Sequence, residues 1–219
     1  MNCCDTKRYD AVFGARRARA DLKRYRKKGP ARTTRLLIDA LKSVGVQHQT
    51  LLDIGGGIGV IPNELLAAGA ESAVQVDAAE AFVEAAREEA ARQGNAGRVQ
   101  FLRGDFVALA GETEAADIVT LDRVICCYPN MEQLVTTSLA RARRSYGIVI
   151  PRERRLTKAV RMGINLVFRI GRNPFRFYVH SPRDIEALVT RAGFARDFVS
   201  ETQIWRVVVF TRAGPTPAR

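Results

Sequence analysis

Hydrophobic and polar positions follow two different rhythms along the chain. In residues 6–44, apolar positions recur at helical spacing, with a break at Gly29 and Pro30, where a proline suits the first turn of a new helix. From residue 50 onward, short apolar runs alternate with helical stretches, as is typical of successive βαβ units. The apolar runs predict strands at 50–54, 73–77, 99–102, 117–121 and 145–150. We therefore expect a doubly wound α/β fold with a mostly parallel sheet.

The intervening and flanking segments complete this expected architecture. Helices are predicted at about 61–68, 79–93, 156–170 and 182–192, and two late runs, 194–199 and 204–211, predict an antiparallel pair at one sheet edge. We expect the basic helix at 156–170 to bury one face as the crossover after the fifth strand. The chain then divides into an N-terminal helical extension or lid (1–45), a Rossmann-like domain (46–212) and a disordered tail (213–219).

Composition supports one globular α/β domain. The chain has 219 residues, of which 47% are hydrophobic and 26% charged, and no apolar run approaches the roughly 20 residues that cross a bilayer. Its four cysteines form two adjacent pairs, Cys3–Cys4 and Cys126–Cys127, a spacing that fits neither a disulfide framework nor a zinc module. We therefore expect no metal site and a reducing, cytoplasmic setting.

The net charge of +12 is concentrated in residues 16–35 and 141–176. Basic runs of this kind bind nucleic acid or an anionic membrane surface, or simply form a solvated helix face. We favour the solvated face and keep the two binding functions as alternatives.

The most informative segment is the glycine-rich turn after the first predicted strand. Asp53, Gly55, Gly57 and Gly59 alternate with other residues there, and glycines at such a turn let the backbone approach a ligand closely. The spacing departs from the dinucleotide pattern Gly-x-Gly-x-x-Gly, because Pro62 stands where a third glycine would follow Gly57 and Gly59.

Carboxylates follow the next two predicted strands. Asp77 ends the second strand, where it could accept hydrogen bonds from both ribose hydroxyls of a nucleoside. Asp105 follows the third strand, where it could accept from an adenine amino group while Phe106 covers the ring. Each acid alone could be a turn residue or a helix cap. Together, at three successive strand ends, these residues predict one nucleoside site.

On these residues the stretch from about 51 to 129 resembles the class I S-adenosylmethionine-dependent methyltransferases. The resemblance matches Asp53, Gly55, Gly57 and Gly59 to the family's first motif, Asp77 to its ribose-binding acid, and Asp105 with Phe106 to its adenine-contacting position. It implies a methyltransferase that uses S-adenosylmethionine as its cofactor.

Three further segments, 127–129, 177–181 and 184–193, resemble the magnesium-protoporphyrin O-methyltransferases. Those enzymes carry His-Tyr-Pro where this chain has Cys127-Tyr128-Pro129, so a porphyrin substrate and a histidine base at that position do not carry over. For the acceptor site we expect Tyr128 to orient the acceptor, with His180 as a candidate base and a surface or capping role as its alternative. Cys126 and Cys127 are expected to be small buried residues rather than nucleophiles.

The sequence thus predicts methyl transfer to an O or N atom of a small-molecule acceptor. Two other functions stay open. One is an RNA or protein methyltransferase that uses the basic N-terminal helices. RNA binding also favours aromatic residues among the cations, and these are sparse here, which counts against it. The other is a non-catalytic module that binds a nucleoside or touches a membrane peripherally through the helix at 156–172.

Overall fold

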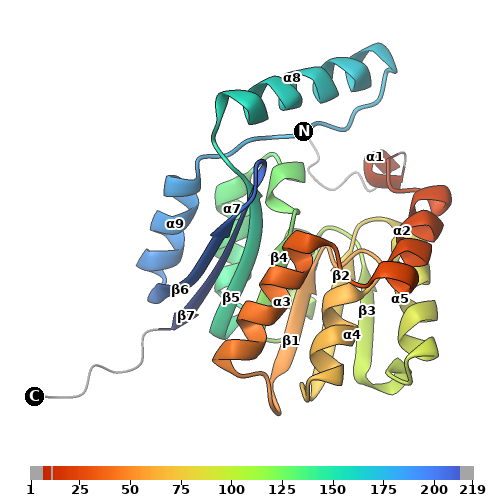
Figure 1. Cartoon of the computed structure of the whole chain (residues 1–219), viewed down its shortest axis with the longest axis vertical. Coiled ribbons are helices and arrows are strands. Elements are labelled where there is room, and N and C mark those ends of the chain that lie inside the picture. The colour runs from red at the N-terminus through yellow and green to blue at the C-terminus, as the bar shows by residue number, and fades with distance from the viewer. Residues whose placement is uncertain (1–6, 11, 213–219) are drawn as a thin grey trace, which may run out of the picture.

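The computed structural model describes residues 7–10 and 12–212, so the predicted tail at 213–219 and the pair Cys3–Cys4 lie outside the described residues. Within them the chain folds into one sheet of seven strands in the order β3-β2-β1-β4-β5-β7-β6 (Figure 1). The strands are β1 (Thr50–Ile54), β2 (Ser72–Asp77), β3 (Val99–Arg103), β4 (Ala116–Asp122), β5 (Ala142–Pro151), β6 (Phe194–Glu201) and β7 (Trp205–Arg212).

Five strands run parallel and the last two close one edge. β1 pairs in parallel with β2 and β4, whereas β7 pairs antiparallel with both β5 and β6. After β1 the chain extends the sheet on one side through β2 and β3, and β4 then pairs with the other side of β1. Open sheets of this kind bind ligands at that switch point, beyond the carboxyl ends of the strands. The predicted doubly wound, Rossmann-like sheet with an antiparallel pair at its edge is confirmed.

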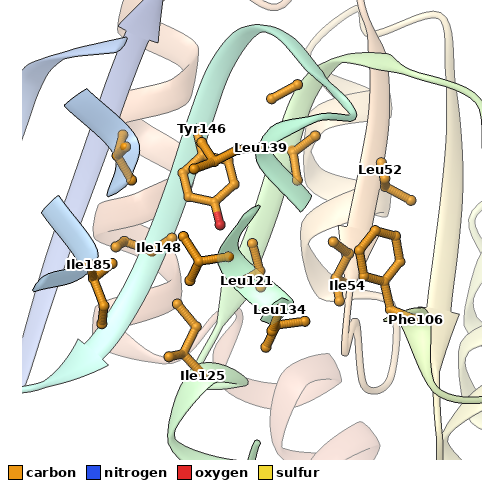
Figure 2. Packing of buried hydrophobic residues seen from close by; sticks show 14 of the residues in the cluster. Leu52, Ile54, Phe106, Leu121, Ile125, Leu134, Leu139, Tyr146, Ile148 and Ile185 are labelled. Atoms are coloured by element: carbon orange, nitrogen blue, oxygen red, sulfur yellow. The ribbon is translucent and has the colours of Figure 1, made fainter. Parts of the chain in front are cut away.

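Helices cover both faces of the sheet because the parallel strands are apolar on both sides. One face carries α3 (Arg32–Val44), α4 (Val60–Ala67) and α5 (Glu80–Arg92), which share a buried cluster with β1 and β4. The other face carries α6 (Phe106–Leu109), α7 (Met131–Leu139) and α9 (Pro182–Arg191), whose apolar residues pack with those of β4 and β5 (Figure 2). The remaining helices are α1 (Lys7–Asp10), α2 (Ala15–Lys28), α8 (Arg155–Ile170) and the 3-10 turns η1 (Ala96–Arg98), η2 (Ala110–Glu112) and η3 (Ile125–Cys127).

Helix α7 was not predicted from the sequence. It has nine residues and includes Val135, Thr136 and Thr137, whose β-branched side chains lower helix propensity. The signal was its cap: the Asn130 side chain accepts a hydrogen bond from the Gln133 backbone N–H at 3.1 Å.

The predicted packing of α8 on the sheet is wrong. Figure 1 shows α8 standing apart from the sheet, above its upper end, and Thr157 is the one buried side chain among those described in this helix. The physical reason is that α9 supplies the burial on that face, with Ile185 and Val189 in the core. Within residues 7–10 and 12–212, no helix is both long and apolar enough to cross a bilayer.

Candidate active site

The glycine-rich turn joins β1 to α4 in a conformation that requires glycine. Gly55, Gly57 and Gly59 all have positive φ angles, of 65°, 58° and 78°. At Gly55 space is restricted as well, because a Cβ would lie 2.4 Å from Cγ2 of Val124. Gly55 N–H donates to the Val76 carbonyl at 2.7 Å, which ties the turn to β2. The alternating glycines therefore bring bare backbone to the cavity wall at the switch point.

Asp53 supports this turn from beneath. Its Oδ1 accepts a hydrogen bond from the Thr120 hydroxyl at 2.6 Å, and its buried Oδ2 has no hydrogen-bond partner among the described residues. A Cβ on Gly56 would lie 2.6 Å from that Oδ2. Burial raises the pKa of Asp53 to about 8, with the nearby charges of Asp122 and Asp77 adding to the effect. The structure thus corrects one expectation, because Asp53 acts on the turn instead of lining the cavity.

Asp77 links the turn to the next strand end. Its Oδ2 accepts from Gly57 N–H at 2.8 Å and its Oδ1 accepts from Ala79 N–H at 2.9 Å. Burial raises the pKa of Asp77, and these backbone N–H groups oppose that shift. An ionised carboxylate has about four acceptor positions, so each oxygen keeps capacity for one more donor. Asp77 lines the cavity, where the predicted ribose hydroxyls could provide those donors.

Asp105 and Tyr128 form a buried pair on the same side of the sheet. Asp105 caps α6 by accepting from Val107 N–H at 2.9 Å, and its other oxygen accepts from the Tyr128 hydroxyl at 3.0 Å. Tyr128 is only 6% exposed. Its hydroxyl engages the predicted adenine-binding carboxylate, and Tyr128 also lines the cavity, so its role toward the acceptor stays a prediction. Phe106, at the start of α6, packs beside Ile54 and also lines the cavity (Figure 2).

These strand ends open into a cavity of about 450 Å³. One side carries the predicted donor residues, namely Gly55, Gly57, Asp77, Asp105 and Phe106. Most of the remaining lining residues are aromatic or apolar and include Tyr9, Val12, Phe13, Val124, Cys126, Cys127, Tyr128, Ile164, Phe168, Phe175, Phe177 and Trp205, and the charged ones among them are Arg17, Asp21, Asp122 and Arg123. Among the described residues that line it, Asp53, Gly59 and His180 are not found. The volume and the apolar lining with few polar groups are typical of small-molecule sites.

The roof of the cavity joins the N-terminal segment to residues 168–177 through edge-on aromatic contacts. Phe175 makes edge-on contacts with Tyr9 at 6.0 Å, with Phe13 at 5.6 Å and with Phe168 of α8 at 5.4 Å between ring centroids. Phe13 also contacts Phe82 of α5. Each such pair contributes about 0.5–1.5 kcal/mol beyond the area it buries. The N-terminal helices and the 171–180 segment therefore cover the cavity together.

His180 does not face the cavity, which corrects its assignment as a candidate base. Its Nε2 lies 2.9 Å from the Tyr128 carbonyl oxygen, and its ring stacks on Tyr178. A ring nitrogen that faces a carbonyl oxygen carries a proton, so this atom donates and cannot accept one. Burial lowers the pKa of His180, against the effect of the Tyr128 and Ile125 carbonyls. We assign His180 to holding the 125–128 segment in place.

Sequence reasoning missed the polar group at the end of β4. Asp122 lines the cavity and accepts from Thr34 Oγ1 at 2.5 Å and from Arg123 Nε at 3.0 Å. Arg123 adopts a positive φ of 62°, which no residue type in the sequence signals. Cys126 is buried and Cys127 is partly exposed, and their sulfurs lie 3.8 Å apart. The hydrogen bond with the neighbouring Cys127 thiol, together with burial, raises the pKa of Cys126 and keeps it a neutral thiol. The expectation that Cys127 is buried as well is wrong, because this residue is partly exposed and lines the cavity.

Comparison with known proteins decides the chemistry of this site. Residues 51–147 match the family model described as "Methyltransferase domain". This stretch is a methyltransferase domain. The match includes the turn, Asp77, Asp105 and Tyr128, and it confirms the predicted class of enzyme and its cofactor, S-adenosylmethionine.

Solved structures share the fold of this chain at low sequence identity. Magnesium protoporphyrin IX methyltransferase from Synechocystis PCC 6803, with bound SAH, is 21% identical with a TM-score of 0.66, over 83% of this chain and 82% of that one. An O-methyltransferase family protein from Burkholderia thailandensis is 19% identical with a TM-score of 0.71, over 94% and 63%. An O-methyltransferase family 2 protein from Planctomyces limnophilus DSM 3776, in complex with apigenin, is 15% identical with a TM-score of 0.58, over 85% and 63%. A search of curated protein sequences finds no match.

The residues present fit the cofactor. A Cβ at Gly55 would collide with Val124, so the glycine leaves room for bare backbone at the cavity wall. Asp77 and Asp105 offer carboxylate oxygens on the same wall, as a neutral or cationic nucleoside requires. The individual binding roles stay predictions.

Proposed function

We propose that this methyltransferase modifies an O or N atom of a small, largely apolar and aromatic acceptor bound beneath the roof. The observation that carries the proposal is the aromatic lining of the cavity beyond the donor residues, which includes Phe168, Phe175, Phe177 and Trp205. Flat rings of this kind bind planar apolar molecules through edge and face contacts. The apigenin complex of the Planctomyces protein agrees with an acceptor of that shape.

The chain's own residues then have distinct tasks. Gly55, Gly57 and Asp77 hold the donor, and the Tyr128 hydroxyl fixes Asp105 against it. S-adenosylmethionine, when bound, supplies a methyl group that is already activated. The protein therefore contributes mainly positioning and the exclusion of water.

The reaction needs a general base only if the acceptor atom loses a proton when it is methylated. We assign that task to Asp122, because it is a carboxylate on the cavity wall at the end of β4. Its hydrogen bonds from Thr34 and Arg123 fix the orientation of both oxygens. The aromatic N-terminal residues Tyr9 and Phe13 act as the lid over donor and acceptor.

Calorimetric titration with S-adenosylmethionine, S-adenosylhomocysteine and NAD tests the donor half. We expect the two sulfur nucleosides to bind and NAD not to bind. Asp77→Ala should weaken binding by about fivefold or more, because it removes two hydrogen bonds to the ribose worth ~1–3 kcal/mol. The matched control is Asp197→Ala on β6, an exposed carboxylate away from the cavity, which should leave the affinity unchanged. Equal affinity in Asp77→Ala and wild type would refute the donor assignment.

Methyl transfer to a panel of aromatic hydroxyl and amino compounds, beside aliphatic ones of similar size, tests the acceptor half. We expect turnover with the aromatic compounds, reduced in Phe175→Leu through a higher KM. Trp205 is the single tryptophan of the chain and lines the cavity, so its fluorescence reports acceptor binding directly. Transfer to aliphatic compounds alone would exclude the aromatic acceptor.

A second candidate, methylation of RNA, is favoured by the solvent-exposed basic residues of α2, which include Arg16, Arg19 and Lys23. Against it, the aromatic residue of that helix, Tyr25, is buried and donates its hydroxyl hydrogen to Glu64, so it cannot stack on a base. RNA binding that falls steeply with salt and is lost in Arg16→Gln/Arg19→Gln would support this candidate.

A further inference from the structure

Helix α8 presents an apolar face to solvent. Met162, Leu166, Val167 and Ile170 are 68%, 56%, 67% and 75% exposed, whereas almost all other large hydrophobic side chains of the described chain are at least partly buried. The opposite face of the same helix is turned toward the protein, with Ile164 and Phe168 on the cavity roof. The helix is therefore apolar on two sides, and only one of them has a partner within the described chain.

Helical geometry makes the outward face continuous. At 100° per residue, Met162, Leu166 and Ile170 follow one another at i+4 spacing, and Val167 extends the face to an arc of about 140°. Contiguous exposed apolar surface of this kind marks an interaction site.

A basic strip borders this face. Arg161 and Arg169 are exposed on α8, where Arg169 projects next to Met162, and Arg172 is exposed just beyond the end of the helix. No Asp or Glu occurs anywhere from residue 154 to residue 183. An apolar face flanked by cations, without acids, complements the interface of an anionic lipid bilayer.

We propose that α8 lies in the interface of an anionic membrane, with Met162, Leu166, Val167 and Ile170 among the acyl chains and the arginines at the lipid phosphates. A helix of 16 residues is ~24 Å long and lies flat in such an interface. A second copy of the chain is the poorer occupant, because the same basic flank would face itself and each copy carries a net charge of +12.

Docking there places lipid directly over the roof of the cavity, since Ile164 and Phe168 line that roof from the inner side of the same helix. If the proposed function holds, the aromatic acceptor is one that partitions into the membrane. The docking itself does not depend on that function.

Vesicle flotation of the full chain tests the docking without any assay of activity. We expect binding to phosphatidylserine–phosphatidylcholine vesicles, weak binding to pure phosphatidylcholine, and loss of binding at high salt. Leu166→Gln/Ile170→Gln should weaken binding at least tenfold by removing apolar surface. Arg161→Gln/Arg169→Gln should weaken it about 25-fold, at roughly fivefold for each arginine.

The controls carry the same chemical changes elsewhere. Val199→Gln removes an exposed apolar side chain from β6, and Arg16→Gln/Arg19→Gln removes two exposed arginines from α2. Both should bind vesicles within about twofold of wild type, and all variants should keep the wild-type melting temperature. Absence of binding, or an equal loss in the α2 variant, would overturn the proposal. So would a self-association in sedimentation velocity that Leu166→Gln/Ile170→Gln abolishes, because the face would then belong to a second copy.

Discussion

Replacing Tyr128 by phenylalanine tests whether its hydroxyl positions the donor site or orients the acceptor. The change removes one hydroxyl, which donates to Asp105 Oδ2 at 3.0 Å in a buried setting. A hydrogen bond to a charged group contributes about 1.5–3 kcal/mol, and the carboxylate oxygen loses this donor. For a chain of this size, about 2 kcal/mol corresponds to a fall of ~4–8 °C in Tm.

The two roles predict different kinetics. If the hydroxyl fixes Asp105, Tyr128→Phe raises the Kd for S-adenosylmethionine while kcat at saturating donor changes little. If the hydroxyl orients the acceptor, donor affinity is unchanged and kcat falls. We expect the first pattern, with a Kd increase of about three- to tenfold, measured by calorimetry beside Tyr178→Phe as the control. Unchanged donor affinity and unchanged Tm would refute the assigned role.

Three further predictions concern the turn, its support at Asp53, and Glu89, which joins α5 to Arg26 of α2. Gly55→Ala should weaken donor binding at least tenfold in calorimetry, because its Cβ would lie 2.4 Å from a Val124 methyl group. Gly94→Ala is the matched control, with φ of 75° and open space around it, and similar losses in both would contradict the steric reasoning. In urea unfolding, the free energy of unfolding of Asp53→Asn relative to wild type should rise by about 1.4 kcal/mol for each pH unit from pH 5 to pH 7. The reason is that a pKa raised to about 8 makes the folded wild type bind a proton which the unfolded chain has released, so its stability falls as the pH rises. A pH-independent difference would exclude this ionisation. Burial alone would raise the pKa of Glu89, but hydrogen bonds from Arg92, Gln93 and Arg26 outweigh it and lower that pKa to about 2. The stability from this carboxylate is fully present above the unfolded pKa of 4.5 and is lost as the pH falls toward 2, so Glu89→Gln should cost about 3 kcal/mol at pH 7 and little near pH 2.

Sequence periodicity predicted the strands and the mostly parallel sheet because each βαβ unit is built from near neighbours in the chain. The glycine-rich turn could be predicted for the same reason. Gly55 and Gly57 adopt positive φ angles, which favour glycine, so the residue types themselves indicate the turn. Asp77 and Asp105 could be placed on one wall because the carboxyl ends of parallel strands share one edge.

The predictions that failed concern the direction in which a side chain points and its contacts with residues far away in the sequence. Whether Asp53 points up to the cavity or down to Thr120 depends on strand pairing across 67 residues. His180 carries a polar atom whose partner comes from a distant segment of the chain. The roof brings Tyr9 against Phe175, and no local pattern encodes that contact. The packing of α8 was mispredicted because helical periodicity reveals an apolar face but not what covers it.

The position of β7 between β5 and β6 has a consequence for the order in which the enzyme assembles during synthesis. The strands that carry the donor residues, β1 to β4, are complete by Asp122 and form the adjacent pairs β1–β2, β2–β3 and β1–β4 without any later strand. The sheet edge forms only after the ribosome has released residues 205–212, which must return to β5 across more than fifty residues. We therefore expect a nascent chain to form the donor part of its site first, and to complete the sheet edge that carries Trp205 only after residues 205–212 have been synthesised.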